Sequence, residues 1–272
     1  MAEATKRYAV VTGANKGIGL GIVKQLASDG MTVVLTARDE KRGLEAVEKL
    51  QQSGLAGEVV FHQLDVANPS TIATLAEFIK TQFGKLDILK ETTDWNKVMT
   101  ENYELAKECV QINYYGAKRT TEALIPLLQL SESPRIVNVS SSTGKLNKIP
   151  SDRVKGVFSD FENLTEERID EVLTQFLEDF KEGSLESKGW PSYVSSYILS
   201  KVAMNAYTRV LAKKYPDFRI NCVCPGFVKT DINFNSGLLP VEEGASRVVK
   251  LAFLPNDGPS GFFFSQNEVT DF

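Results

Sequence analysis

The chain has 272 residues, of which 42% are hydrophobic and 24% charged, and its formal net charge is −4. This composition is that of a globular protein with a large core, which excludes disordered, collagen-like and disulfide-rich chains. The negative charge argues against a nucleic-acid partner, and a single histidine, His62, excludes multi-histidine metal sites and argues against a Ser-His-Asp hydrolase.

Strand and helix patterns alternate along the first third of the chain. Runs of β-branched and apolar residues predict strands, and apolar residues three and four positions apart predict helices. Repeated β-α units of this kind form a parallel sheet covered by helices. The predicted strands are 8–12, 32–36, 59–64 and 86–89, and the predicted helices are 20–28, 41–52 and 70–83.

The same alternation continues in the second half. Strands are predicted at 135–139 and 219–224, and helices at 98–112, 116–129 and 197–213. A long charged stretch with helical periodicity precedes the last of these helices. We therefore predict one domain, 1–272, of the α/β class with a doubly wound, Rossmann-type parallel sheet. It carries an inserted helical subdomain at about 145–191.

A glycine-rich turn lies directly between the first strand and the first helix. Glycines there let the backbone approach a pyrophosphate, and the helix N-terminus supplies amide donors. A tight turn without a ligand could also be rich in glycine, but the strand-turn-helix context favours a dinucleotide site. The residues predicted to form it are Gly13, Asn15, Lys16, Gly17, Ile18 and Gly19.

The end of the second strand indicates which dinucleotide is bound. A site selective for NAD usually offers a carboxylate there, whereas this strand ends at Ala37 and is followed by Arg38. Arg38 can bind a 2′-phosphate through two hydrogen bonds, and Lys16 can add a second positive charge. We therefore expect NADP(H). The alternative is that Arg38 pairs with a nearby carboxylate such as Asp39.

Tyr197 and Lys201 form the candidate catalytic pair. A ketone that accepts a hydride becomes an alkoxide and needs a proton, which Tyr197 can supply. Lys201 lies one helical turn further on the same face, so its ammonium would lower the pKa of Tyr197 from about 10 toward neutrality. Ser141 can polarise the carbonyl by hydrogen bonding. Each of these residues alone has an ordinary structural explanation, and their combination favours catalysis.

These motifs stand in a fixed order along nearly the whole chain. In that order the sequence resembles the short-chain dehydrogenase/reductases and, within them, the monomeric carbonyl reductases. Segments such as 15–19, 124–130, 164–168, 189–192 and 258–261 resemble the plant branch that contains salutaridine reductase and the menthone:neomenthol reductases. The motifs are the turn 12–19, Asp65-Val66, Asn113-Tyr-Tyr-Gly116, Asn138-Val-Ser-Ser141, Tyr197-x-x-x-Lys201 and Pro225-Gly226-x-x-x-Thr230.

The resemblance implies roles for further residues. Lys201 would also hold the nicotinamide ribose, and Asn113 would support a water-linked proton route to that lysine. Ser141 matches the family serine, with Ser140 and Ser142 as the alternatives. The remaining contacts that it implies for the cofactor are Asn113, Tyr197, Lys201, Asp65, Val66, Pro225, Gly226, Val228 and Thr230.

The resemblance also implies the reaction, which is NADPH-dependent reduction of a ketone to a secondary alcohol on a plant terpenoid or alkaloid. Some plant members that reduce a conjugated double bond lack the tyrosine, so Tyr197 favours carbonyl reduction, with an enone reductase as an alternative. In monomeric relatives the insertion covers the surface that other members use for tetramers, and we expect a monomer. Segments 145–191 and 227–239 would wall the substrate pocket.

One family motif is absent from this chain. Members carry Asn-Asn-Ala-Gly directly after the fourth strand, where this sequence continues from Leu89 into Lys90-Glu-Thr-Thr-Asp-Trp95. Three explanations are open: a segment omitted from the sequence, a natural or engineered shortened form, or replacement by other residues. The abrupt join favours a missing segment. If the gap is real, it should weaken cofactor binding and impair activity. A second alternative is therefore a shortened, NADP-binding member of the family without catalysis.

The N-terminus, the apolar runs and the cysteines indicate the cellular compartment of the protein. The N-terminal residues show no apolar core of a signal peptide, and the apolar runs are too short to span a bilayer. Cys109, Cys222 and Cys224 lack metal-finger spacing and indicate thiols in a reducing compartment. We expect a cytoplasmic protein with no metal and no membrane partner.

Overall fold

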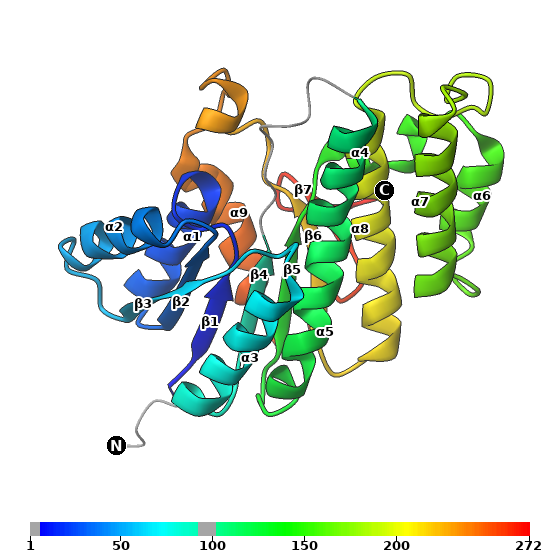
Figure 1. Ribbon diagram of the computed structural model, residues 1–272. Coiled ribbons are helices and arrows are strands. Elements are labelled where there is room, and N and C mark those ends of the chain that lie inside the picture. Colours follow the sequence, from blue (N-terminus) through cyan, green and yellow to red (C-terminus); the bar gives the residue numbers. More distant parts are fainter. Residues whose placement is uncertain (1–5, 92–101) are drawn as a thin grey trace.

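The sheet at the centre of the molecule has eight strands in the order β3-β2-β1-β4-β5-β6-β7-β8 (Figure 1). The computed structural model describes residues 6–91 and 102–272. Neighbouring strands are parallel except for β8, which is antiparallel to β7. The strands are β1 Tyr8–Val11, β2 Thr32–Ala37, β3 Glu58–Gln63, β4 Ile88–Glu91, β5 Arg135–Val139, β6 Arg219–Cys224, β7 Phe263–Ser265 and β8 Glu268–Thr270.

Helices cover both faces of this sheet, which confirms the doubly wound α/β prediction (Figure 1). One hydrophobic cluster lies between the sheet and α1, α2 and α9, and the other joins α3, α5, α7 and α8 to the opposite face. None of the helices in the described ranges is long and apolar enough to cross a membrane. The helices are α1 Gly17–Ser28, α2 Glu40–Gln51, α3 Pro69–Phe83, α4 Tyr103–Val110, α5 Ala117–Leu128, α6 Asp152–Ser159, α7 Glu166–Lys181, α8 Ser195–Lys214 and α9 Val241–Ala252.

The strand order reverses between β1 and β4, which follow each other in the sheet but not in the chain. In open parallel sheets a crevice forms at such a reversal, beyond the carboxyl ends of the strands. The backbone N–H of Thr12 donates to the carbonyl of Lys90 at 2.8 Å and ties the turn after β1 to β4. The fold therefore places the glycine-rich turn at the crevice.

The predicted gap between helices 98–112 and 116–129 is wrong where the structure describes it. Helix α4 begins at Tyr103, and it continues through a π-helical segment, Gln111–Gly116, into α5. A π turn holds an extra residue, so the apolar residues lose their 3.6-residue spacing and the pattern imitates a boundary. Residues 98–101 of the first predicted helix lie outside the described residues.

Helices α6 and α7 lie in segment 145–191, on the outer side of α8 (Figure 1). A buried carboxylate ties this segment together: Asp179 on α7 accepts hydrogen bonds from Trp190 Nε1 at 2.7 Å and Gln175 Nε2 at 3.0 Å. The Trp190 ring packs edge-on against Phe176, with 5.4 Å between ring centroids. These contacts fix α7 to the segment that leads into α8.

Strand β4 ends in two buried charged side chains, Lys90 and Glu91, which are 1% and 3% exposed. Adjacent strand residues point to opposite faces, and neither Lys90 Nζ nor Glu91 Oε1 has a hydrogen-bond partner within the described ranges. Burial lowers the pKa of Lys90 well below its usual value, and the charge of Lys201 lowers it further. Burial also raises the pKa of Glu91 well above its usual value.

We predict that Lys90→Met stabilises the chain by about 1–3 kcal/mol at neutral pH, because a buried amine that has no hydrogen-bond partner among residues 6–91 and 102–272 is replaced by an apolar side chain of similar length. The unfolded chain binds a proton at Lys90 up to pH of about 10.4, whereas the folded chain releases it at lower pH. Stability of the native sequence should therefore rise with pH in that window. Urea unfolding between pH 7 and pH 10 measures this rise, which should be smaller in the variant, where only Lys201 contributes a rise of the same sign.

Glu91→Gln serves as the matched variant, because Glu91 changes stability with pH in the opposite direction to Lys90. The raised pKa of Glu91 makes the folded chain hold a proton that the unfolded chain releases above pH of about 4.3, so stability falls as pH rises through this window. The glutamine should remove that fall and leave the alkaline rise in place. Identical pH profiles for both variants and the native sequence would contradict the burial of these charges.

Candidate active site

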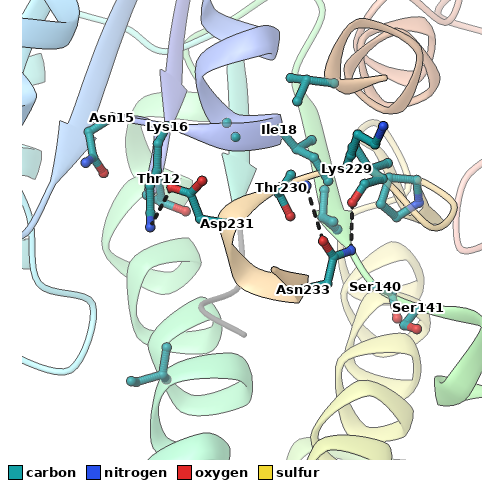
Figure 2. Close-up of a pocket in the computed structure, with 18 of the residues that line it drawn as sticks. Thr12, Asn15, Lys16, Ile18, Ser140, Ser141, Lys229, Thr230, Asp231 and Asn233 are labelled. Carbon is teal, nitrogen blue, oxygen red and sulfur yellow. Dashed lines mark hydrogen bonds and ion pairs between the residues drawn. The ribbon is translucent and has the colours of Figure 1, made fainter. Parts of the chain in front are cut away.

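A groove of 720 Å³ runs along the carboxyl ends of the strands (Figure 2). Its walls come from the turn after β1, the ends of β2, β3 and β5, and the segment after β6. Most of the residues predicted to bind the cofactor line it. They are Gly13, Asn15, Lys16, Gly17, Ile18, Gly19, Arg38, Asp65, Val66, Pro225, Gly226, Val228 and Thr230, together with Ser141.

The glycine-rich turn is shaped to receive an anion. Gly13 and Gly17 have φ values of 56° and 57°, which favour glycine, and a Cβ on Gly19 would lie 2.7 Å from the carbonyl oxygen of Gly13. The N-cap of α1, Lys16, makes no side-chain cap bond, and the first turn holds no acidic residue. The N-termini of α8 and α9 also lack a side-chain cap, whereas α2, α3, α4, α6 and α7 are each capped by a side chain. The amides and positive dipole of α1 therefore fit a phosphate group.

Two basic side chains, Arg38 and Lys16, line the part of the groove near this turn. Lys16 Nζ pairs with Asp231 Oδ2 at 3.4 Å, and the pair links the turn to the opposite wall (Figure 2). Because both side chains are largely exposed, water screens this pair and it contributes little to stability. A bound phosphate can therefore exchange for Asp231 as the partner of Lys16.

Asp65 also has a structural role in the turn before α3. Its Oδ1 accepts a hydrogen bond from the backbone N–H of Ala67 at 3.0 Å, which forms a turn before α3. Val66 packs closely on the π segment, because a Cβ on Gly116 would lie 2.7 Å from Val66 Cγ2. Both residues still face the groove.

Four residues predicted to be catalytic are buried in one region. Tyr197 and Lys201 lie on α8, Asn113 on the π segment, and Ser141 at the end of β5. Lys201 Nζ donates to the carbonyl oxygen of Val139 at 2.8 Å and lies 5.8 Å from the centroid of the Tyr197 ring. The fold therefore brings α8 and the end of β5 together, as a shared site requires.

Burial dominates the electrostatics of this region. It raises the pKa of Tyr197 well above 10, while hydrogen bonding to Ser141 and Thr143 acts in the opposite direction. It also lowers the pKa of Lys201 to about 7, so the lysine is only partly charged at neutral pH. The expected fall of the Tyr197 pKa toward neutrality is thus wrong for the chain as described. Tyr197 remains protonated, which is the form that a proton donor requires.

Three residues of the site were missed by the sequence analysis. Thr143 Oγ1 donates to Ser141 Oγ at 3.0 Å. Asn233 Nδ2 donates to the carbonyl of Val228 at 2.8 Å, and Asn233 Oδ1 accepts from the N–H of Thr230 at 3.3 Å (Figure 2). Arg247 on α9 donates to the carbonyl of Pro225 at 3.3 Å. The adjacency of Thr143 to the serine run was a usable signal, whereas the other two contacts depend on the fold.

The wall formed by 227–239 carries exposed apolar side chains. Phe227 lines the groove and is half exposed, and Phe234 and Leu238 are more than four-fifths exposed. Tyr193, just before α8, is exposed as well. A bulky apolar molecule could bury these side chains on binding.

Family models and curated relatives match this chain. The family model described as short chain dehydrogenase matches residues 7–151, and the one described as Enoyl-(Acyl carrier protein) reductase matches residues 183–258. The chain is 57% identical to (+)-neomenthol dehydrogenase of Arabidopsis thaliana, over all of both sequences. It is 37% identical to Carbonyl reductase [NADPH] 1 of Rattus norvegicus, over 98% of this chain and 99% of the other.

The fold matches a solved structure closely. The structure of salutaridine reductase from Papaver somniferum superposes with a TM-score of 0.91 at 50% identity, and the match covers 95% of this chain and 99% of the other.

The comparisons also give the length of the alignment to the Arabidopsis relative. The alignment to the Arabidopsis protein runs over 296 positions although this chain has 272 residues, so 24 positions have no residue here. The chain is therefore shorter than this relative although it spans its whole length. Of the segment where the motif is expected, Lys90 and Glu91 end β4, and residues 92–101 lie outside the described residues.

Proposed function

The chain belongs to the short-chain dehydrogenase/reductase family and is an oxidoreductase, and from this premise we propose that it reduces a ketone of a plant terpenoid or alkaloid to a secondary alcohol with NADPH. The observation that carries the proposal is the junction of Tyr197, Ser141 and Lys201 at the end of β5, beside a groove of 720 Å³. The names of relatives, a neomenthol dehydrogenase and a salutaridine reductase, support the substrate class.

The proposed reaction assigns one task to each residue. When bound, the nicotinamide supplies the hydride that adds to the carbonyl carbon. Ser141 donates a hydrogen bond to the carbonyl oxygen and stabilises its developing negative charge. Tyr197 transfers its hydroxyl proton to that oxygen, which completes the alcohol. The ammonium of Lys201 stabilises the tyrosinate that remains until a proton returns from solvent along the route through Asn113.

We propose NADPH rather than NADH as the cofactor because positively charged side chains line the groove. The uncapped N-terminus of α1 would hold the pyrophosphate. Arg38 and Lys16, which both line the groove, would hold the 2′-phosphate. The name of the rat relative, Carbonyl reductase [NADPH] 1, supports the same choice.

Two alternatives are separated by one assay. The intact mass of the purified protein is measured first, to establish that the chain has 272 residues. The protein is then mixed with NADPH and a panel of cyclic ketones and enones. Oxidation of NADPH with formation of the secondary alcohol supports the proposal. A saturated ketone as product identifies an enone reductase instead. Tight NADPH binding without turnover identifies a shortened, NADP-binding member without catalysis.

Replacing the proposed proton donor should abolish reduction of the ketone. Tyr197→Phe is expected to lower kcat by about 10²-fold or more, because it removes the hydroxyl that transfers the proton to the alkoxide. Tyr207→Phe is the matched control, since Tyr207 lies buried on the same helix in the hydrophobic core, edge-on against Tyr114. The control should keep kcat within about twofold, and high residual turnover in Tyr197→Phe would disprove its role.

Reversing one charge should change the preference between cofactors. Arg38→Glu removes a charge-assisted bond of about 1.5–3 kcal/mol to the 2′-phosphate, so NADPH binding should weaken at least about tenfold relative to NADH. Fluorescence titration with both nucleotides measures the two Kd values. Lys41→Glu makes the same charge change on exposed α2 as a control. An unchanged ratio of Kd values in Arg38→Glu would remove Arg38 from the phosphate site.

We propose that the protein is a cytoplasmic monomer. Helix α7 packs on α8 and α4 and covers the outer face of α8. Size-exclusion chromatography with light scattering should give the mass of one chain, 30.1 kDa. A mass of four chains would show that this face remains open to association.

A further inference from the structure

The aspartates that line the groove differ in what they bind. Asp39 accepts a hydrogen bond from the backbone N–H of Arg42 at 2.9 Å and caps α2, and Asp65 serves the turn before α3. Asp231, in the segment after β6, instead reaches across the groove to Lys16 at 3.4 Å (Figure 2). Of these three aspartates, Asp231 is therefore the one placed to compete with an anionic ligand for Lys16.

The wall 227–239 is a closed loop with a fixed base. The backbone N–H of Lys229 donates to the carbonyl of Leu239 at 2.8 Å, which joins the two ends of the loop. A Cβ on Gly244 of α9 would lie 2.4 Å from Val228 Cγ2, so Val228 packs directly on that helix. The base of the wall is therefore held by its own hydrogen bonds and by α9.

The tip of the wall, 230–236, lies against the opposite side of the groove. A Cβ on Gly17 would lie 3.5 Å from Thr230 Cγ2, so Thr230 stands over the glycine-rich turn. Phe234 is 89% exposed and contributes little to holding the tip in place. Phe234 and Asn235 also have left-handed backbones, with φ values of 52° and 59°, which cost free energy in residues other than glycine. An ion pair at the tip can therefore influence where the wall lies.

We propose that Asp231 and Lys16 form a latch that couples the cofactor to the position of the wall 227–239. A 2′-phosphate on Lys16 displaces Asp231 and leaves two negative groups close together, which releases the tip from the glycine-rich turn. A nucleotide without this phosphate leaves the latch closed. Exposed apolar side chains that would meet the ketone lie on this wall, so NADPH, but not NADH, allows them to adjust to the substrate. The proposal rests on the proposed function, because it requires a phosphate at Lys16.

The latch also sets the affinity for the phosphate, because binding must first break the ion pair. An exposed pair of this kind changes an equilibrium constant by up to about fivefold. Asp231 therefore opposes binding of a 2′-phosphate by that factor. By linkage, the phosphate weakens the closed position of the wall by the same factor.

The first test measures affinity with two nucleotide fragments that lack nicotinamide. Adenosine 2′,5′-bisphosphate carries the 2′-phosphate, and adenosine 5′-monophosphate does not. In calorimetric titrations of the full chain, Asp231→Asn should bind the bisphosphate about two- to fivefold more tightly and leave the Kd of the monophosphate unchanged. Asp29→Asn removes the same charge at the exposed end of α1 and should change neither Kd. An equal gain in both variants, or none in Asp231→Asn, would overturn the proposal.

A double-mutant cycle shows whether Asp231 acts through Lys16. Lys16→Met should weaken binding of the bisphosphate, and in that background Asp231→Asn should no longer tighten it. A gain that persists without Lys16 would mean that Asp231 repels the phosphate directly, and the latch would be refuted.

The second test measures the position of the wall without any reaction. Hydrogen exchange of the backbone amides in 229–236 is followed by mass spectrometry. Without nucleotide, Asp231→Asn should accelerate this exchange about two- to fivefold, and saturating bisphosphate should do the same in the native sequence. The monophosphate should have no effect, and the bisphosphate should have no further effect on Asp231→Asn. Slower exchange of 229–236 when the native sequence binds the bisphosphate would contradict release of the tip.

The outcomes separate this inference from the proposed function. A chain that responds in this way and reduces no ketone would refute the proposed reaction and support the latch. A chain that reduces ketones with NADPH but shows no effect of Asp231→Asn in either test would refute the latch alone. Equal affinity of the native sequence for the two fragments would refute both the latch and the choice of NADPH.

Discussion

The hydrogen bond from Lys201 Nζ to the carbonyl of Val139 is the contact on which the arrangement of the site depends. It joins a buried amine on α8 to the last residue of β5, and Ser141 follows two residues later. Because the helix is fixed at this point, Tyr197, one turn earlier, is held at the end of β5 within hydrogen-bonding reach of Ser141 and Thr143. Sheet and helix therefore position the candidate proton donor.

The same burial makes the site unusually sensitive to neighbouring charge. Lys90, Glu91 and Lys201 are all buried and influence one another electrostatically. Lys90 and Glu91 stand where the family pattern departs in this chain. A buried amine and a buried carboxyl favour their neutral forms, so the end of β4 carries less charge than its sequence suggests. The charged residues at this position therefore change the electrostatic surroundings of the candidate catalytic lysine.

Sequence reasoning found what local patterns encode. The strands and the glycine-rich turn have short-range signatures, and the joint order of Tyr197, Lys201 and Ser141 identified a family. It failed where the outcome depends on distant contacts. The π segment at Asn113 interrupts the helical period, and the pairing of Lys16 with Asp231 requires the two walls of the groove to meet. The raised pKa of Tyr197 was missed because spacing on a helix reveals the neighbouring lysine but not the extent of burial.

The bond between Thr12 N–H and the Lys90 carbonyl has a consequence for how the molecule folds. The turn that would bind the pyrophosphate follows β1. One edge of β1 pairs with β2, and its other edge pairs with β4, which lies far along the chain. Pairing of such distant strands carries a high loop-closure entropy and forms slowly. A partly folded chain can thus hold its first βα unit without a finished phosphate cradle. Competence to bind a nucleotide should therefore be acquired late, in the step that inserts β4 between β1 and β5.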